Sequence, residues 1–185
     1  MDLLAKLFGD ATQVRLMRFF LFHPDGVFAS KELSEKLQVP ARSLNSSLSR
    51  LRSAGFAKKK AKGWALDTSF PHMMSLRELL LGNMLADVSI EQRVARAGSI
   101  KLIVASGVFM NGDFDTRTDI LIVGERLNDR VLKRAVASIE ADSGTEIRYV
   151  ALSAKDFRYR MDMNDRLLRD VFDYPHRKLV NKIGV

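Results

Sequence analysis

The sequence predicts an α+β protein in which a helical first part precedes a small mixed α/β part. In residues 1–70, apolar residues recur at helical spacing in three successive segments. Beyond residue 100, short strand-like segments alternate with helix-like ones. We therefore expect an N-terminal domain over residues 1–70, a helical connector over 71–99 and a C-terminal α/β domain over 100–185.

The composition is that of a folded protein without membrane segments. The 185 residues are 46% hydrophobic and 28% charged, which is ordinary for globular proteins. No cysteine is present, so disulfides and thiolate chemistry are excluded, and the three histidines are too far apart to form a helical metal-binding pair. The apolar runs are much shorter than the ~18 residues of a membrane span. The N-terminus lacks the features of a signal peptide. We expect a cytoplasmic protein without a membrane partner.

The positive charge is concentrated in the N-terminal part. The chain carries a net charge of +8; residues 1–70 hold 12 Lys/Arg against 6 Asp/Glu, and the remaining residues hold 18 against 16. Clustered cations neutralise phosphates, so this distribution predicts a polyanion-binding surface. The alternative is a merely solvated basic face.

The N-terminal elements begin and end at recognisable signals. A helix is predicted over residues 12–22, and a short second helix follows with Ser30 as its N-cap. The third helix, residues 40–54, is expected to have Pro40 at its first position and Gly55 at its C-terminal end.

The third helix has the composition of a DNA-contacting element. Leu44, Leu48 and Leu51 form its buried face, and no acid occurs between Pro40 and Ala54. Short hydroxyl and amide side chains allow close approach to DNA, and arginine makes paired contacts to guanine. The other faces carry Arg42, Ser43, Asn45, Ser46, Ser47, Ser49, Arg50, Arg52 and Ser53.

A basic β-hairpin is predicted after this helix. The segment "FAKKKAKGWALD" contains two short strands around Ala61–Gly63, and Phe56 and Trp64 are expected in the core. Three helices followed by a basic hairpin predict a winged helix-turn-helix, whose third helix enters the major groove of double-stranded DNA. A winged helix used only for protein contacts is the alternative. The predicted DNA-binding residues are Arg42, Ser43, Asn45, Ser46, Ser47, Arg50, Lys58, Lys59, Lys60 and Lys62.

The connector has apolar residues at helical spacing, which fits either core packing or a dimerisation surface. These residues are Met73, Leu76, Leu80 and Met84. In the C-terminal part we expect strands at 100–105, 119–123 and 146–152, a helix at 128–142 capped by Asn128, and helical turns capped by Ser153. A short helix at 165–172 and a closing strand near 178–180 complete the prediction.

Two family resemblances agree with this organisation. Residues 7–81, starting "LFGDATQVRLMRFFLFHPDG", resemble winged-helix regulators of the MarR/ArsR-like type. Residues 100–152, which include "SGVFMNGDFDTRTDILIVGE", resemble the minimal nucleotidyltransferase domain of the polymerase-beta superfamily. Together the two segments resemble a prokaryotic architecture in which such a winged helix precedes a nucleotidyltransferase-like domain.

The nucleotidyltransferase motif is incomplete. In that superfamily a Gly-Ser loop holds the nucleotide phosphates, and two acids of an Asp-x-Asp strand hold Mg²⁺. Gly107 and Gly112 match loop glycines, but Val108 stands at the serine position. Asp119 is the single acid that matches the strand.

The register of the Asp-x-Asp strand stays open, and both alternatives leave the metal site one ligand short. Either Arg117 occupies the first acid position or Leu121 occupies the second. Glu146 is the candidate for a third acid. The resemblance therefore implies a vestigial nucleotide and metal site made of Gly107, Gly112, Asp119 and Glu146, without catalytic residues, bound metal or cofactor.

These observations predict a homodimeric DNA-binding transcriptional regulator. Its C-terminal domain is expected to be an inactive nucleotidyltransferase fold that serves dimerisation or binds a partner protein or a nucleotide. One alternative is an antitoxin-type Mg²⁺-dependent nucleotidyltransferase that uses Asp119 and Glu146. Another is a pure protein-interaction module.

Overall fold

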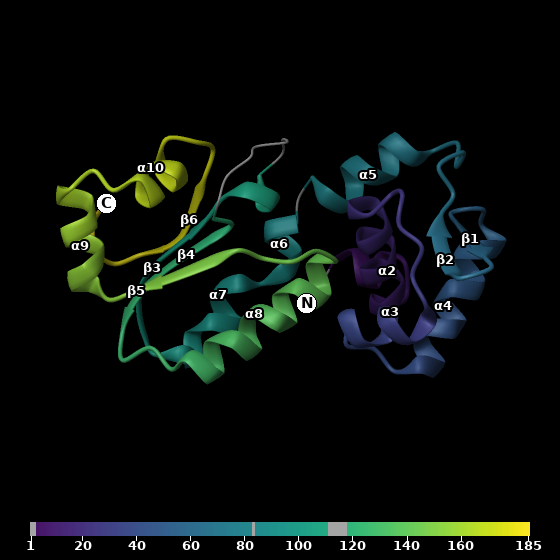
Figure 1. The fold of residues 1–185 in the computed structure, drawn as a ribbon, viewed down its shortest axis with the longest axis horizontal. Helices are drawn as coiled ribbons and strands as arrows, with labels where there is room; N and C mark the ends of the chain where they lie inside the picture. Colours follow the sequence, from purple (N-terminus) through teal and green to yellow (C-terminus); the bar gives the residue numbers. More distant parts are fainter. Residues whose placement is uncertain (1–2, 83, 111–117) are drawn as a thin grey trace. The chain divides into compact units, whose positions relative to one another are not determined.

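The computed structural model describes residues 3–82, 84–110 and 118–185 and has the α+β composition that the sequence predicts (Figure 1). The chain forms two compact units. The N-terminal unit comprises residues 1–88 and 140–146, and the C-terminal unit comprises residues 89–139 and 147–185. The segment expected as a connector, 71–99, is thus divided between the two units, and each is described by itself below.

The N-terminal unit contains a group of helices and one β-hairpin. The hairpin strands pair antiparallel from Ala57↔Leu66 to Lys60↔Gly63, and Phe28 adds an isolated antiparallel bridge to Trp64. The order of helices and hairpin agrees with the sequence prediction. The elements are α1 (Leu3–Leu7), α2 (Ala11–Phe22), α3 (Ser30–Lys36), α4 (Ala41–Ser53), β1 (Ala57–Lys60), β2 (Gly63–Leu66), α5 (Met73–Leu81) and α6 (Met84–Val88).

Two of the predicted helix starts are shifted by one residue. Ala29, and not Ser30, is the N-cap of α3; the Ser30 hydroxyl instead accepts a hydrogen bond of 3.2 Å from the Trp64 indole Nε1. Pro40 stands at the N-cap of α4 with extended backbone (φ −61°, ψ 141°), so the helix begins at Ala41.

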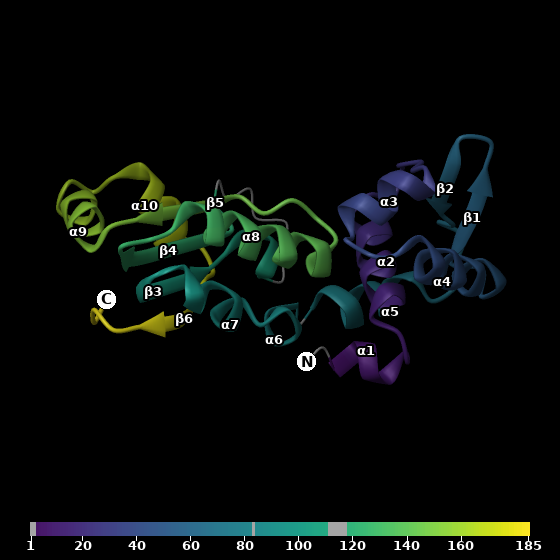
Figure 2. The same ribbon diagram turned by 90° about the horizontal axis from the view of Figure 1, so that it is seen from below.

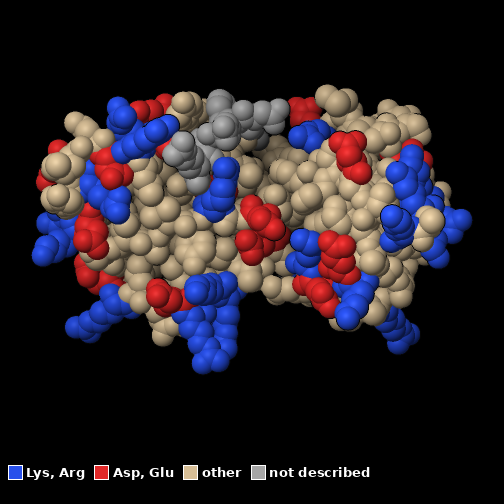
Figure 3. All heavy atoms as spheres, viewed as in Figure 1, with Lys and Arg blue, Asp and Glu red and all other residues tan. Residues whose placement is uncertain are grey.

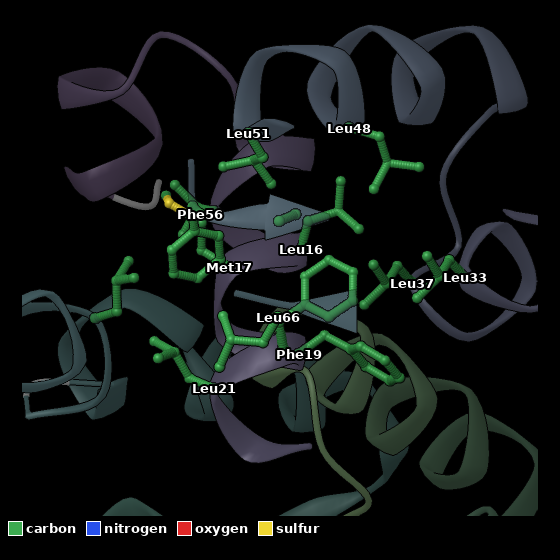
Figure 4. Packing of buried hydrophobic residues seen from close by; sticks show 14 of the residues in the cluster. Leu16, Met17, Phe19, Leu21, Leu33, Leu37, Leu48, Leu51, Phe56 and Leu66 are labelled. Carbon is green, nitrogen blue, oxygen red and sulfur yellow. The ribbon is translucent and has the colours of Figure 1, made fainter. Parts of the chain in front are cut away.

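The core of this unit is formed by α2 together with the faces of α3, α4 and the hairpin that turn towards it (Figure 4). Leu16, Leu33 and Leu48 are fully buried there, and Phe56 is 1% exposed, as expected of a core residue. Trp64 is half-buried and packs against the same cluster.

Arg18 is the largest fully buried side chain of the described residues. Its Nε donates to the Leu80 carbonyl at 3.0 Å, near the end of α5, and its Nη1 donates to the Asp142 carbonyl at 3.3 Å. A cation is favourable where the last carbonyls of a helix lack intrahelical partners. Arg18 of α2 is thus hydrogen-bonded to the last turn of α5 and to the last turn of the helix Asp129–Ser143.

The connector residues at helical spacing belong to the core. Leu80 and Met84 are fully buried, and Met73 and Leu76 pack against the N-terminal cluster. Met74 and Leu79, on the other face of α5, are 78% and 47% exposed. Core packing therefore explains the predicted pattern, and dimerisation remains a prediction.

The C-terminal unit is built on a four-stranded sheet with the order β5-β4-β3-β6. β3 pairs antiparallel with β4 and β6, and β4 pairs parallel with β5. The elements are α7 (Ile90–Val94), the 3-10 helix η1 (Ala95–Ala97), β3 (Ser99–Ala105), the 3-10 helix η2 (Gly107–Phe109), β4 (Ile120–Glu125), α8 (Asp129–Ser143), β5 (Tyr149–Leu152), α9 (Ala154–Asp162), α10 (Arg166–Phe172) and β6 (Arg177–Asn181).

Helices cover both faces of this sheet. Leu102, Leu121 and Val123 pack with Phe157 of α9 and Val171 of α10 on one face. Side chains alternate along a strand, so the residues between them point to the other face. Figure 2 shows α7 and α8 on that side. Both central strands are consequently almost entirely apolar.

The predicted caps of the C-terminal helices are confirmed. The Asn128 Oδ1 accepts from the Val131 N–H at 3.1 Å, and the Ser153 Oγ accepts from the Asp156 N–H at 3.0 Å. The strand predicted at 146–152 is shorter in the structure, where β5 begins at Tyr149. The Arg148 N–H, one residue earlier, donates at 2.9 Å to the Asp119 carboxylate instead of to a strand carbonyl. Within the described residues, no helix is long and apolar enough to cross a membrane.

Candidate nucleic-acid interface

Helix α4 is held in place by its leucine face and by a defined C-terminal end. Leu44, Leu48 and Leu51 are at most 2% exposed. Gly55 adopts φ +78°, its N–H donates to the Arg52 carbonyl at 3.0 Å, and the Phe56 N–H donates to the Leu51 carbonyl at 2.9 Å. These two bonds form a Schellman motif, which confirms the predicted role of Gly55.

The outer face of α4 carries five of the ten predicted contact residues. Arg42, Asn45, Ser46 and Arg50 are exposed, and Ser43 is half-buried. No Asp or Glu occurs from Pro40 to Leu66, a segment that holds seven Lys/Arg. The exposed surface of α4 is therefore polar, basic and free of its own acids.

Ser47 does not lie on this surface. It is fully buried, and its Oγ donates to the Asp10 Oδ2 at 2.6 Å. Ser47 precedes Leu48 and lies three residues after Leu44, so its short side chain falls within the buried face of the helix. The prediction that Ser47 contacts DNA is wrong; this serine fastens α4 to the start of α2.

Arg50 is exposed but already has a partner within the protein. Its Nη2 lies 2.9 Å from the Asp10 Oδ2, and its side chain remains 51% exposed. Asp10 also caps α2, because its Oδ1 accepts from the Thr12 N–H at 2.9 Å. One carboxylate thus fixes the start of α2 and the position of an arginine on α4.

The environment of Asp10 favours its charged form. Partial burial opposes ionisation, but the hydrogen bonds from Ser47 and Thr12 and the charge of Arg50 outweigh it and lower the pKa of Asp10. The position of Asp10 before a predicted helix, with Gln13 three residues later, is a capping signal in the sequence. Its contact with Arg50, 40 residues away, has no sequence signal.

Three lysines of the hairpin are exposed. Lys59, Lys60 and Lys62 make no ion pair among the described residues. Lys58 differs, because its Nζ lies 3.1 Å from the Asp67 Oδ1. The Ser69 hydroxyl and the Lys58 ammonium hold the pKa of Asp67 below its ordinary value.

The hairpin is attached to the helices through Phe28. Backbone hydrogen bonds of 2.9 and 2.8 Å join Phe28 and Trp64 in both directions. Gly63 allows this approach, since a Cβ built there would lie 2.2 Å from the Phe28 carbonyl oxygen. Figure 3 shows Lys and Arg side chains gathered over the hairpin and α4.

The second candidate site, around Asp119, is organised as a structural ion pair. Asp119 is fully buried, and its Oδ1 accepts from the Val108 N–H at 3.1 Å. Arg148 reaches both carboxylate oxygens, with Nε 3.1 Å from Oδ2 and Nη2 3.2 Å from Oδ1, and the Arg148 N–H also donates to Oδ2. The carboxylate that the resemblance offers as a metal ligand is therefore surrounded by N–H donors.

Gly107 and Glu146, the other described residues of the vestigial site, belong to different units. Gly107 adopts φ +53° at the start of η2, and the next residue, Val108, contacts Asp119 through its backbone only. Glu146 is exposed and falls in the other unit. Gly112 and Arg117 lie outside the described residues. In the part of the chain that the structure describes, no group of three His, Asp or Glu side chains is placed to hold a metal ion.

Leu121, the alternative occupant of an acid position, belongs to the apolar core between the sheet and α9. The ion pair of Asp119 with Arg148, 29 residues away, has no signal in the sequence. Comparisons with protein-family models, with curated proteins and with solved structures found no match for this chain.

Proposed function

We propose that the N-terminal unit is a winged helix-turn-helix that binds double-stranded DNA and that the protein is a transcriptional regulator. In this proposal α4 is the recognition helix in the major groove, and the β1–β2 hairpin is the wing that contacts the backbone. The observation that carries the proposal is the acid-free exposed face of α4 next to three exposed hairpin lysines, Lys59, Lys60 and Lys62, which make no ion pair within the described part of the chain. The contact set is Arg42, Ser43, Asn45, Ser46, Arg50, Lys58, Lys59, Lys60 and Lys62.

The residues of the contact set differ in the part of the DNA that they are expected to contact. Arg42, Asn45 and Ser46, in the first half of α4, are exposed and are the residues expected to reach base edges, as in the N-terminal part of a recognition helix. Lys59, Lys60 and Lys62 neutralise phosphates without reading sequence. Arg50 keeps its contact with Asp10, which presents its guanidinium in a fixed position.

The experiment is a titration of fluorescent duplex DNA with the full chain, followed by anisotropy from about 50 to 200 mM salt. We expect a steep salt dependence, and each lost phosphate contact lowers the slope of log K against log salt by about 0.9. Lys59→Ala/Lys60→Ala/Lys62→Ala should lower the slope by about 2–3.

The matched control removes three exposed cations elsewhere, in Lys155→Ala/Arg158→Ala/Arg166→Ala, and should leave the slope unchanged. Selection from a random duplex pool then tests sequence preference. Weak binding that is blind to sequence at every salt concentration would contradict a regulator.

For the C-terminal unit we propose a nucleotidyltransferase-like fold without activity, which serves dimerisation or binds a partner protein or nucleotide. The ion pair between Asp119 and Arg148 supports this, because a guanidinium occupies the carboxylate that a catalytic Mg²⁺ needs. Labelled ATP with Mg²⁺ or Mn²⁺ and cell extract tests the alternative of an active transferase. Transfer of label by the wild type that Asp119→Ala abolishes would overturn the proposal.

A further inference from the structure

A second cluster of cations lies in the C-terminal unit. Arg130, Lys133 and Arg134 are exposed on the first half of α8, and their spacing of three and four residues places them on one helix face. We call these three residues the α8 basic face. Arg96 of η1 and Arg126 of the turn before α8 are exposed beside it.

Backbone contacts place these flanking residues next to the start of α8. The Asn128 N–H donates to the Ala97 carbonyl at 2.7 Å, which joins the end of η1 to the first turn of α8. A Cβ on Gly98 would lie 2.9 Å from the Arg126 carbonyl oxygen, so the Arg126 backbone also lies against this junction. Figure 3 shows Lys and Arg side chains projecting together over this region of α7 and α8.

The charges of the α8 basic face are not neutralised by the protein. None of its three side chains makes an ion pair within the described residues. Among the described residues between 91 and 129, three acids are exposed, Glu91, Glu125 and Asp129, against five exposed cations of the cluster and its flanks. Of these acids, Glu125 uses its carboxylate within the protein, where it accepts from the Ala154 N–H at 3.3 Å.

This arrangement opposes the stability of the helix. Arg130 lies in the first turn, where the helix dipole disfavours a cation, and Arg130 and Arg134 are like charges four residues apart. Yet the C-terminal part of the chain is nearly balanced in charge, with 18 Lys/Arg against 16 Asp/Glu beyond residue 70. The cluster is therefore a local feature and does not follow from general composition.

We propose that the α8 basic face is a second contact surface for the phosphate backbone of nucleic acid, in addition to the winged helix. This inference rests on the proposed DNA-binding function. Four of the five cations are arginines, whose planar guanidinium matches phosphate oxygens in pairs. A lipid surface fits less well, because the apolar residues Leu132, Val136 and Ile139 of α8 are buried in the protein and offer nothing for insertion.

The surface holds phosphates without reading bases. Long cationic side chains on an exposed helix face add affinity that is independent of sequence and sensitive to salt. The protein would then bind with two surfaces. The recognition helix discriminates between sequences, and the α8 basic face slows dissociation from any duplex.

The test is the salt dependence of binding by the full chain carrying Arg130→Gln/Lys133→Gln/Arg134→Gln. We expect the slope of log K against log salt to fall by about 2–3 and affinity at low salt to fall at least about tenfold, by the same factor on a selected and on a random duplex. Glutamine keeps side-chain length and helix propensity, and thermal melts check that the variant is folded. Arg130→Lys/Arg134→Lys keeps the charge and should retain the slope.

Lys155→Ala/Arg158→Ala/Arg166→Ala again serves as the control of equal charge loss. If the α8 variant binds like this control while the hairpin variant loses affinity, the inference fails and the proposed function stands. If the wild type itself binds no duplex at any salt concentration, the proposed function fails and the inference with it. If the α8 variant loses affinity for poly-glutamate but not for DNA, the surface belongs to an acidic protein partner and the inference is wrong.

Discussion

At the scale of single residues, Asp119 shows how a position suited to catalysis can serve structure instead. A buried carboxylate is stable only when donors surround it, and Arg148 and the Val108 N–H supply them. A catalytic acid held ready for a metal would be under-satisfied in the free protein, and its removal would be neutral or stabilising. If Asp119 has a structural role, its removal should instead lower the stability of the protein.

Asp119→Ala should therefore lower the free energy of unfolding by about 2–4 kcal/mol, because it removes the buried acceptor of the Val108 N–H and of the Arg148 backbone and guanidinium donors. Urea denaturation followed by circular dichroism measures this change. Arg148→Ala is the companion variant, and its smaller expected cost reflects a side chain that is 50% exposed. A gain in stability for Asp119→Ala would argue for a functional acid.

Asp10 links residue chemistry to the presentation of α4. Its pKa is lowered in the folded protein, so its ion pair and hydrogen bonds add stability above the unfolded pKa of about 3.9. This contribution is lost as the pH falls through the folded pKa. Asp10→Asn keeps a good N-cap but removes the charge facing Arg50.

We expect Asp10→Asn to be less stable than the wild type at pH 7 and the difference to shrink below about pH 4. Urea midpoints at both pH values measure it. Asp25→Asn, which removes an exposed carboxylate in the turn after α2, is a control for loss of the charge alone. A difference between wild type and Asp10→Asn that stays constant with pH would contradict the ionised contact.

At the scale of elements, the β1–β2 hairpin depends on its junction with Phe28. Gly63→Ala would place a Cβ within 2.2 Å of a backbone oxygen that cannot move aside easily. We expect a loss of at least about 2 kcal/mol and weaker DNA binding through displacement of the hairpin lysines. Thermal melts and the anisotropy titration measure the two effects.

Gly55→Ala is a matched control for this variant. Gly55 also has a positive φ, +78°, but no atom lies within 4 Å of a built Cβ. Its cost should be limited to the backbone strain of a left-handed residue, about 1 kcal/mol. Equal losses for the two variants would show that strain, and not the close approach to Phe28, sets the stability of the hairpin.

Elements with a local signal were predictable from the sequence. Leu44, Leu48 and Leu51 marked the buried face of α4, and Asn128 and Ser153 marked helix starts, because spacing and capping are properties of neighbouring residues. Contacts between distant residues were not predictable. Helical spacing places Ser47, unlike Ser46, at the leucine face of α4, but its hydrogen bond to Asp10, 37 residues away, has no signal in the sequence.

At the scale of the whole molecule, the distribution of charge says more than its total. Two basic surfaces, one on each unit, account for much of the net charge of +8, while buried or paired cations such as Arg18 and Arg148 serve packing. Counting charges by sequence segment detected the first surface. The same count missed the α8 basic face, because other acids of the C-terminal part cancel the cations of this face in the sum.

We expect the functional molecule to contain two chains. One recognition helix contacts few base pairs, and a two-fold dimer doubles the contacts on a palindromic site. Apolar side chains remain exposed on α5, where Met74 and Leu79 are 78% and 47% exposed. We expect light scattering to give about twice the chain mass of 20.9 kDa.

Met74→Glu/Leu79→Glu should shift the protein to monomer and weaken DNA binding, with little effect on the melting temperature of the monomer, because exposed positions tolerate charge. Met161→Glu/Met163→Glu, at 40% and 64% exposure in and just after α9, is the control that should stay dimeric. A wild-type protein that is monomeric both free and on DNA would contradict the dimer. Recognition would then rest on one winged helix, with the α8 basic face as its remaining source of affinity.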